Sequence, residues 1–434
     1  MASAISKYKP AHFKQKQSHK FRNTVLILLV CLLFLSGFFT IYYEIDLKAV
    51  FRSPESAKTI LTETVRNASD DFLFWIKDRT GLDEIPKPKP LSAKRNRSEE
   101  EKLQEYIDQM TLSEKVGQMF IIHFPKDEAG KEAETYQPAG FVLFGKDFEN
   151  EDKAGMRQKL KDAQKAELPL LFAVDEEGGK VNRISSRQTF RKEPFSSPQD
   201  LYEQGGWKAV EHDTREKCSL LKEVGINVNF APVADVSTDR SDFIFERSFG
   251  KNADDTARYV SLVVKEMDRE GIASTLKHFP GYGNNTDTHT GISVDRRPLS
   301  RFEEEDFVPF REGIASGADL VMVSHNVVNA IDPNLPASLS PKVHDVLRND
   351  LAFEGVSVTD DLMMQGITSF TDGENPAVLA VLAGNDLLCS TNYQEDIPAV
   401  LRAAKEGQIP EAQIDQSVLR ILKLKQKLGL LHLL

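Results

Sequence analysis

Two short segments of the chain combine residue types that suit proton transfer and nucleophilic attack. Residues 277–295 read KHFPGYGNNTDTHTGISVD, with Lys277 and His278 at the end of an apolar run and Asp287 and His289 two residues apart in a polar loop. A carboxylate that hydrogen-bonds an imidazole orients the ring and tunes its pKa, so this pair could exchange a proton near neutral pH. In the second segment, SVTDDLMM (residues 357–364), Asp360 could attack an electrophilic carbon.

The two segments together fit the cleavage of a glycosidic bond. That reaction needs a group that protonates the leaving oxygen, and in its retaining form it needs a carboxylate that forms a covalent intermediate. The simpler alternatives are that Asp360 and Asp361 only cap a helix, and that Asp287 and His289 lie by chance in a solvated loop.

Other polar residues could bind a hydroxylated ligand. In VDEEGGKVNR (residues 174–183), Asp175 can accept hydrogen bonds and Arg183 can donate them, while the two glycines allow a close backbone approach. Arg247 in FERSFG is a similar donor, and so are Lys277 and His278, unless they only form structural ion pairs. Because the histidines lack HxH or HExxH spacing, we expect no metal and no other cofactor.

Eight short apolar runs separate these residues. They cover residues 117–123, 139–145, 169–175, 226–235, 272–280, 318–325, 355–361 and 385–390. Continuous apolar runs suit strands buried on both faces, and helical patterns lie between several of them, as at 253–270 and 302–315. This alternation predicts an α/β protein with a (β/α)8 TIM-type barrel. A doubly wound sheet is the alternative, but its glycine-rich phosphate turn does not follow His123.

The candidate residues lie where these runs end. Five runs end in Asp, Lys or His, namely Asp175, Asp235, Lys277 with His278, His325, and Asp360. In such barrels functional groups gather at the carboxyl ends of the strands. The sequence therefore predicts one site at that end of the barrel.

The N-terminal part differs from the rest in composition. Residues 24–43 contain no charge and are long enough to span a bilayer core of about 30 Å, with six basic residues and no acidic residue before them. We therefore predict a cytoplasmic basic tail at 1–23, a transmembrane helix at 24–43, a stalk at 44–97 and a barrel at 98–434. The catalytic domain would then be extracellular on a single-pass membrane protein. A cleaved signal peptide is the alternative reading.

The charge distribution makes one class of partner unfavourable. Residues 1–97 hold 17 Lys/Arg against 9 Asp/Glu, whereas the remainder holds 38 against 57. Residues 98–434 are therefore strongly acidic and would repel the phosphate backbone of a nucleic acid. We expect no nucleic-acid partner. The three cysteines are widely spaced and predict no disulfide framework.

The motifs KHFPGYG, DTH, VDEEGG, FERSFG and SVTDDLMM together resemble glycoside hydrolase family 3, in its β-N-acetylglucosaminidase branch, over about residues 98–434. The resemblance implies a retaining exo-β-N-acetylglucosaminidase that forms a glycosyl-aspartate intermediate. It implies that Asp360 is the nucleophile, His289 the general acid/base and Asp287 its partner. It further implies that Asp175, Arg183, Arg247, Lys277 and His278 bind the N-acetylglucosamine unit.

Three positions depart from the family pattern. Tyr282 stands where histidine is frequent, Thr288 replaces a common serine, and Lys180 replaces arginine. We expect an N-acetylglucosamine-containing glycan as substrate, with peptidoglycan fragments as its natural source. The alternatives are a β-glucosidase, an N-acetylglucosaminide phosphorylase, and a glycan-binding protein without catalysis.

Overall fold

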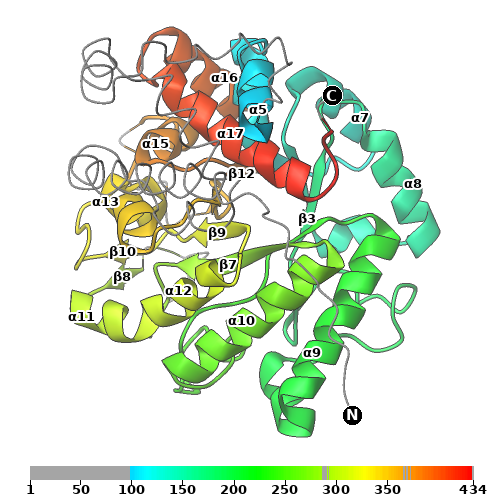
Figure 1. The fold of residues 1–434 in the computed structure, drawn as a ribbon, viewed down its shortest axis with the longest axis vertical. Helices are drawn as coiled ribbons and strands as arrows, with labels where there is room; N and C mark the ends of the chain where they lie inside the picture. Colours follow the sequence, from blue (N-terminus) through cyan, green and yellow to red (C-terminus); the bar gives the residue numbers. More distant parts are fainter. Residues whose placement is uncertain are drawn as a thin grey trace, which may run out of the picture. The chain divides into compact units, whose positions relative to one another are not determined.

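The eight apolar runs form eight strands of one parallel sheet (Figure 1). The computed structural model describes residues 98–285, 291, 293–364, 367, 370–371 and 373–432, all within a unit that spans Asn96–Leu434. The strands are β1 (Phe120–His123), β2 (Gly140–Leu143), β3 (Leu171–Val174), β6 (Val228–Asn229), β7 (Ala273–Phe279), β9 (Leu320–Val323), β11 (Val356–Thr359) and β12 (Leu388–Ser390). Their order is β11-β9-β7-β6-β3-β2-β1-β12, and a parallel bridge between Val358 and Leu387 joins the two edges. The chain therefore has the predicted TIM-type barrel.

Helices connect and surround these strands. They are α5 (Glu99–Ile107), α6 (Leu112–Gln118), α7 (Ala129–Tyr136), α8 (Lys153–Ala163), α9 (Pro198–Val224), α10 (Ala253–Glu270), α11 (Leu299–Arg301), α12 (Phe307–Ala315), α13 (Pro341–Asp345), α15 (Pro376–Ala383), α16 (Tyr393–Lys405) and α17 (Glu411–Lys427). Shorter turns are η1 (Gly145–Phe148), η2 (Phe302–Asp306), η3 (Ala337–Leu339) and η4 (Val346–Asp350). Two small sheets pair β4 (Glu176–Gly178) with β5 (Val181–Asn182), and β8 (Val294–Asp295) with β10 (Val327–Val328).

Local sequence explains where several helices begin. Thr111 caps α6 in a capping box with Glu114, a pattern of neighbouring residues that is typical of a helix start. Asn252 caps α10, whose bounds match the predicted segment 253–270. Ser98 caps α5 at the predicted start of the barrel region.

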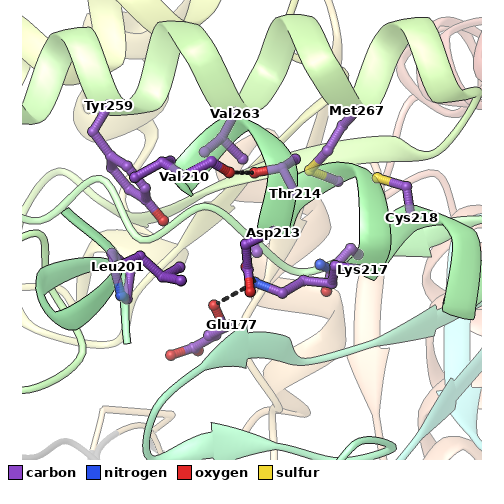
Figure 2. Close-up of a pocket in the computed structure, with 13 residues that line it drawn as sticks. Glu177, Leu201, Val210, Asp213, Thr214, Lys217, Cys218, Tyr259, Val263 and Met267 are labelled. Carbon is purple, nitrogen blue, oxygen red and sulfur yellow. Dashed lines mark hydrogen bonds and ion pairs between the residues drawn. The ribbon is translucent and has the colours of Figure 1, made fainter. Parts of the chain in front are cut away.

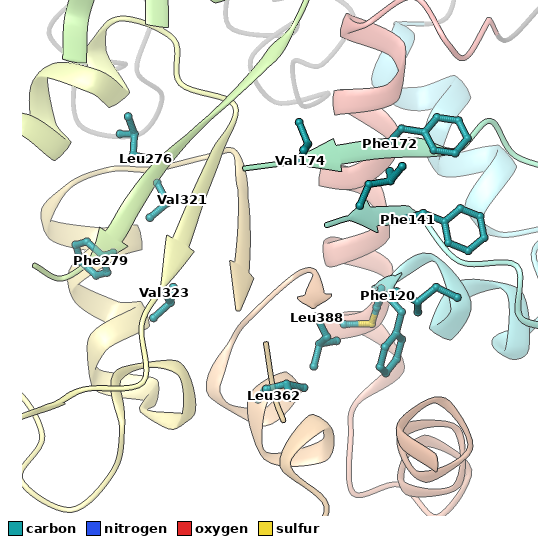
Figure 3. Close-up of a cluster of buried hydrophobic side chains, with 14 of the residues drawn as sticks. Phe120, Phe141, Phe172, Val174, Leu276, Phe279, Val321, Val323, Leu362 and Leu388 are labelled. Atoms are coloured by element: carbon teal, nitrogen blue, oxygen red, sulfur yellow. The ribbon is translucent and has the colours of Figure 1, made fainter. Parts of the chain in front are cut away.

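The strands are buried on both faces, which explains their continuous apolar sequences. On the outer face, Phe141, Phe172 and Val321 belong to a core cluster shared with the surrounding helices (Figure 3). On the inner face, Val142 and Ala173 belong to a second cluster that fills the barrel. Alternate residues of one strand thus pack into the outer and the inner core, as expected for a barrel that is surrounded by helices.

Helix α17 packs at the end of the barrel where the strands begin. Its Ile421 and Leu424 join the inner cluster. Arg420 pairs at 2.9 Å with Asp386, which precedes β12, and Lys427 pairs at 2.6 Å with Asp319, which precedes β9. This end of the barrel is therefore occupied by a structural helix.

The predicted fold class is wrong in one part, the transmembrane helix. Among the described residues, no helix is long and apolar enough to cross a membrane. The longest, α9 and α10, carry charged residues along much of their length, whereas a span needs about 20 apolar residues. Residues 24–43 themselves lie outside the described residues, as do the rest of the predicted tail and stalk. The predicted single-pass location depended on that helix.

Candidate functional site

A buried lysine lies between two carboxylates where the strands end. Lys277, on β7, is 1% exposed, and its Nζ atom lies 2.7 Å from Asp175 and 2.6 Å from Glu177. Asp175 directly follows β3, and Glu177 belongs to the short strand β4. The segment after β3 thus supplies both carboxylates, and they neutralise a charge that burial would otherwise disfavour.

Glu177 also holds an arginine. Arg247 donates from Nε (3.0 Å) and from Nη2 (2.7 Å) to the two carboxylate oxygens of Glu177. Burial alone would raise the pKa of Glu177, but the charges of Lys277 and Arg247 outweigh it and hold that pKa well below its usual range. Glu177 is therefore an anion that fixes two cations at once.

His278 continues this network on the next residue of β7. Its Nδ1 atom lies 2.8 Å from Asp235, and its Nε2 atom lies 3.2 Å from Nη2 of Arg247. Because Arg247 can only donate, Nε2 must accept and Nδ1 carries the proton given to Asp235. Asp235 also accepts from the backbone N–H groups of His278 and Tyr282, so its position is fixed by the chain.

The VDEEGG segment is a tight hairpin. Gly178 and Gly179 adopt positive φ values, and a Cβ atom on Gly178 would lie 2.4 Å from the carbonyl oxygen of Ser196. Glu176 is fully buried and accepts hydrogen bonds from the backbone N–H groups of Arg183, Ile184 and Ser185. The hairpin thereby places Arg183 with its guanidinium 3.8 Å from Asp175.

A small cavity lies behind Glu177, between α9 and α10 (Figure 2). Its volume is about 20 Å³, enough for one water molecule. Lys217 on α9 donates to the backbone carbonyl of Glu177 at 3.0 Å and pairs with Asp213 at 3.2 Å. Burial raises the pKa of Cys218, which also lines the cavity, to about 12, so its thiol stays protonated. Lys217 therefore supports the backbone of Glu177 from the side of the cavity.

Asp360 follows β11 and lies on the same side of the barrel. Its Oδ1 atom accepts from the backbone N–H of Asp361, whose own carboxylate accepts from the N–H of Met363 and from Thr391. The buried His325 lies beneath this turn, with Nε2 3.0 Å from the carbonyl oxygen of Asp361. The carboxylate therefore stands on a turn that several side chains hold in place.

Asp360 and the lysine cluster lie at the same end of the barrel, because β3, β7 and β11 are parallel and these residues lie at or after the ends of those strands. Burial raises the pKa of Cys389 on β12 well above its usual value, and the charges of Asp361, Asp360 and Asp175 raise it further. A single side chain thus lies within electrostatic reach of carboxylates from β3 and β11. The arrangement places the Asp360 carboxylate at the same end of the barrel as a cluster of donors and acceptors that is suited to a polyhydroxylated ligand.

The loop after β7 is anchored at its two ends. Asp287 and His289 lie outside the described residues. Before them, Asn285 donates to Asp295 at 2.7 Å, and after them, Arg297 pairs with both Asp295 and Asp306 at 2.8 Å. The guanidinium of Arg297 packs directly against Gly283, where a Cβ atom would overlap it.

The structure brings together Asp175, Arg183, Arg247, Lys277 and His278, and it places Asp360 at the same end of the barrel. The sequence reasoning missed two residues that organise them, Glu177 and the full role of Asp235. Glu177 stands in the DEEGG segment, but only the tertiary contact with Lys277 distinguishes it from the adjacent Glu176.

Comparison with known proteins gives a consistent result. Residues 111–424 match the model of the glycosyl hydrolase family 3 N-terminal domain. A curated β-hexosaminidase from Idiomarina loihiensis is 33% identical over 286 residues, which cover 63% of this chain and 82% of that protein.

Two solved structures are also similar. A glycoside hydrolase family 3 β-N-acetylglucosaminidase from Paenibacillus sp. str. FPU-7 superposes with a TM-score of 0.69 at 32% identity, covering 74% of this chain and 63% of that one. A β-N-acetylhexosaminidase from Beutenbergia cavernae has a TM-score of 0.65 at 26% identity, covering 73% of this chain and 99% of that one. The chain thus spans less than two thirds of the Paenibacillus enzyme and nearly all of the second.

Proposed function

This chain belongs to glycoside hydrolase family 3, and from that premise we propose that it is an exo-acting β-N-acetylglucosaminidase. It removes terminal β-N-acetylglucosamine residues from the non-reducing ends of glycans. The observation that carries the proposal is the cluster in which Glu177 holds Lys277 and Arg247 beside Asp175, at the same end of the barrel as Asp360. The names of the similar proteins favour an N-acetylhexosaminide over a glucoside.

The cluster is suited to bind one sugar unit. Asp175 can accept from sugar hydroxyls, while Lys277, Arg247 and His278 are held with fixed orientations around the same space. Arg183 adds a further donor, because its side chain is 35% exposed and its Nη2 atom lies 3.8 Å from Asp175. A charged network that is already neutralised can exchange hydrogen bonds with hydroxyls without exposing an unpaired ion.

Asp360 acts as the nucleophile in this proposal. Its carboxylate oxygen bonds to the anomeric carbon while the bond from that carbon to the leaving oxygen breaks, and the leaving oxygen takes a proton. Water then attacks the anomeric carbon, gives up a proton, and the bond to Asp360 breaks. Two displacements at one carbon retain its configuration.

His289 supplies and recovers that proton, with Asp287 orienting it. Both residues lie outside the described residues, so the assignment rests on their spacing and on the family resemblance. An imidazole with a pKa near 6.5 can act as acid in the first step and as base in the second at neutral pH.

The natural substrate is proposed to be a peptidoglycan fragment that ends in N-acetylglucosamine. The full-length chain would then cleave such fragments faster than chitin oligomers of equal length. Efficient cleavage of chitin oligomers with no action on peptidoglycan fragments would contradict this source while leaving the reaction itself intact.

Release of p-nitrophenol tests the reaction directly. The full-length chain is assayed with the β-N-acetylglucosaminide and the β-glucoside, each in phosphate and in phosphate-free buffer. We expect selective cleavage of the N-acetylglucosaminide in both buffers. Preference for the glucoside would favour a β-glucosidase, a strong dependence on phosphate would favour a phosphorylase, and binding without turnover would favour a glycan-binding protein.

A further inference from the structure

Four large apolar side chains remain notably exposed among the described residues, and two of them border the candidate site. They are Phe243 (39%), Leu299 (40%), Met363 (55%) and Leu382 (40%). Phe243 lies in the loop that carries Arg247, and Met363 lies in the turn that carries Asp360. Both loops leave the carboxyl ends of barrel strands, β6 and β11 respectively. Exposed apolar side chains beside a polar pocket are typical of ligand contacts.

The ring of Phe243 is held in place by its own loop. Ser237 donates to Asp242 at 2.7 Å, and the next residue, Ile244, is fully buried. On one side, the ring packs against Tyr282, with centroids 5.8 Å apart, while the other part remains open to solvent. Its position is therefore fixed before any ligand arrives, which lowers the entropic cost of a contact.

Tyr282 links this exposed ring to the sugar-binding cluster. It is 1% exposed and lies edge-on to His278, with centroids 5.1 Å apart. Phe243, Tyr282 and His278 thus form a row of rings that runs from a proposed ligand of the sugar to the solvent. Because Tyr282 is buried, only Phe243 in this row can meet a group outside the pocket.

Met363 is turned outward by its neighbours. Leu362 and Met364 are 2% and 8% exposed, while the backbone N–H of Met363 donates to Asp361 at 2.8 Å. The turn that presents Asp360 therefore also presents a flexible apolar side chain to solvent. A thioether of this kind adapts to ligands of varied shape.

The proposed reaction requires a second binding place beside the pocket for the terminal sugar. In an exo-acting glycosidase the terminal sugar fills the pocket, so the leaving group must extend from the scissile bond toward solvent. We propose that Phe243 and Met363 form the subsite for this leaving group, and that they contact the apolar C–H face of its first pyranose ring. The inference rests on the proposed exo-glycosidase function and adds a recognition site for the portion that is released.

Kinetics with a disaccharide test this subsite on the full-length chain. The substrate is β-1,4-linked di-N-acetylglucosamine, whose leaving group is a pyranose, and free N-acetylglucosamine serves as an inhibitor that occupies the pocket alone. Phe243→Ala and Met363→Ala are compared with Leu382→Ala, an equally exposed apolar residue on α15. Phe243→Leu keeps most of the apolar volume, so it still tests the subsite if the Phe243→Ala variant fails to fold.

We expect Phe243→Ala to lower kcat/KM for the disaccharide about 3- to 10-fold. Met363→Ala should have a smaller effect, Phe243→Leu an intermediate one, and Leu382→Ala none. The inhibition constant of N-acetylglucosamine should stay unchanged in all four variants.

Each other outcome overturns the inference. Unchanged disaccharide kinetics in Phe243→Ala and Phe243→Leu would show that the ring does not contact the leaving group. A parallel loss of N-acetylglucosamine inhibition would place Phe243 in the pocket itself. A wild-type chain that neither binds N-acetylglucosamine nor cleaves the disaccharide would instead refute the proposed function, and the subsite with it.

Discussion

Glu177 and Lys277 form an ion pair of 2.6 Å in which both side chains are at most 2% exposed. Glu177 simultaneously holds Arg247 by two hydrogen bonds. Removal of one member of such a buried pair leaves an uncompensated charge, which costs far more than the net worth of the pair. The positions of the Lys277 and Arg247 side chains thus depend on Glu177.

We expect Glu177→Gln to lower kcat/KM by about 100-fold, because Lys277 and Arg247 lose the anion that fixes them. The free energy of unfolding should fall by about 3 kcal/mol. Enzyme kinetics and thermal unfolding measure the two effects, with the exposed Glu193→Gln as the control.

A double-mutant cycle separates positioning from general destabilisation. If Glu177 acts through Arg247, the losses in kcat/KM of Glu177→Gln and Arg247→Met should be strongly non-additive. Simple additivity would mean that Glu177 supports the fold without orienting Arg247.

Replacement of Asp360 by asparagine should abolish turnover while leaving sugar binding intact. As the proposed nucleophile, Asp360 forms the covalent intermediate, so we expect kcat to fall by about 10,000-fold or more. Asp361→Asn is the matched control, because the amide oxygen can still accept from the N–H of Met363 while the amide NH2 can donate to the hydroxyl of Thr391. We expect Asp361→Asn to lower kcat only about tenfold. Comparable losses in both variants, or loss of N-acetylglucosamine binding in Asp360→Asn, would argue against this role.

The proposed acid/base pair has its own kinetic signature. We expect His289→Gln and Asp287→Asn each to lower kcat by about 100- to 10,000-fold, and the double variant to be little worse than His289→Gln. The pH–rate profile of the wild type should have a limb near the ordinary pKa of histidine, and His289→Gln should remove it. Persistence of that limb in the variant would assign the proton transfer to another group.

The stability of the barrel should depend on a buried lysine in α17. Burial lowers the pKa of Lys425 to about 7, and its Nζ atom donates to Gln118 at 2.7 Å. The unfolded chain holds this proton up to about pH 10.4, so between pH 7 and pH 10 the unfolded state binds more protons and stability rises with pH. Below pH 7 both states are charged and the folded state carries the full cost of burial.

Lys425→Met removes this dependence. We expect the variant to be more stable than the wild type by about 1 kcal/mol or more at pH 6.5, and the difference to shrink as the pH rises toward 9.5. Urea unfolding at several pH values measures it, with the half-exposed Lys423→Met on the same helix as control. A pH-independent difference between Lys425→Met and the wild type would show that the burial of the charge has no such effect.

Much of the architecture was readable from local pattern. The apolar runs are continuous because each strand contributes alternate residues to the inner and outer cores, as Phe141 and Val142 illustrate. The start of α6 was readable from Thr111 and Glu114, since a capping box involves only neighbours in the chain. The transmembrane part of the predicted fold class was wrong, because no helix among the described residues is long and apolar enough to cross a membrane.

The sequence by itself determined which strands exist and which polar residues stand at their ends, because both follow from residue spacing along one segment. It could not distinguish Glu177 from Glu176, two adjacent buried carboxylates. One of them caps backbone N–H groups of its own hairpin, whereas the other neutralises cations from β7 and from the loop after β6. Only the closure of the barrel decides this, because it brings distant strand ends within ion-pair distance and burial makes each pairing obligatory.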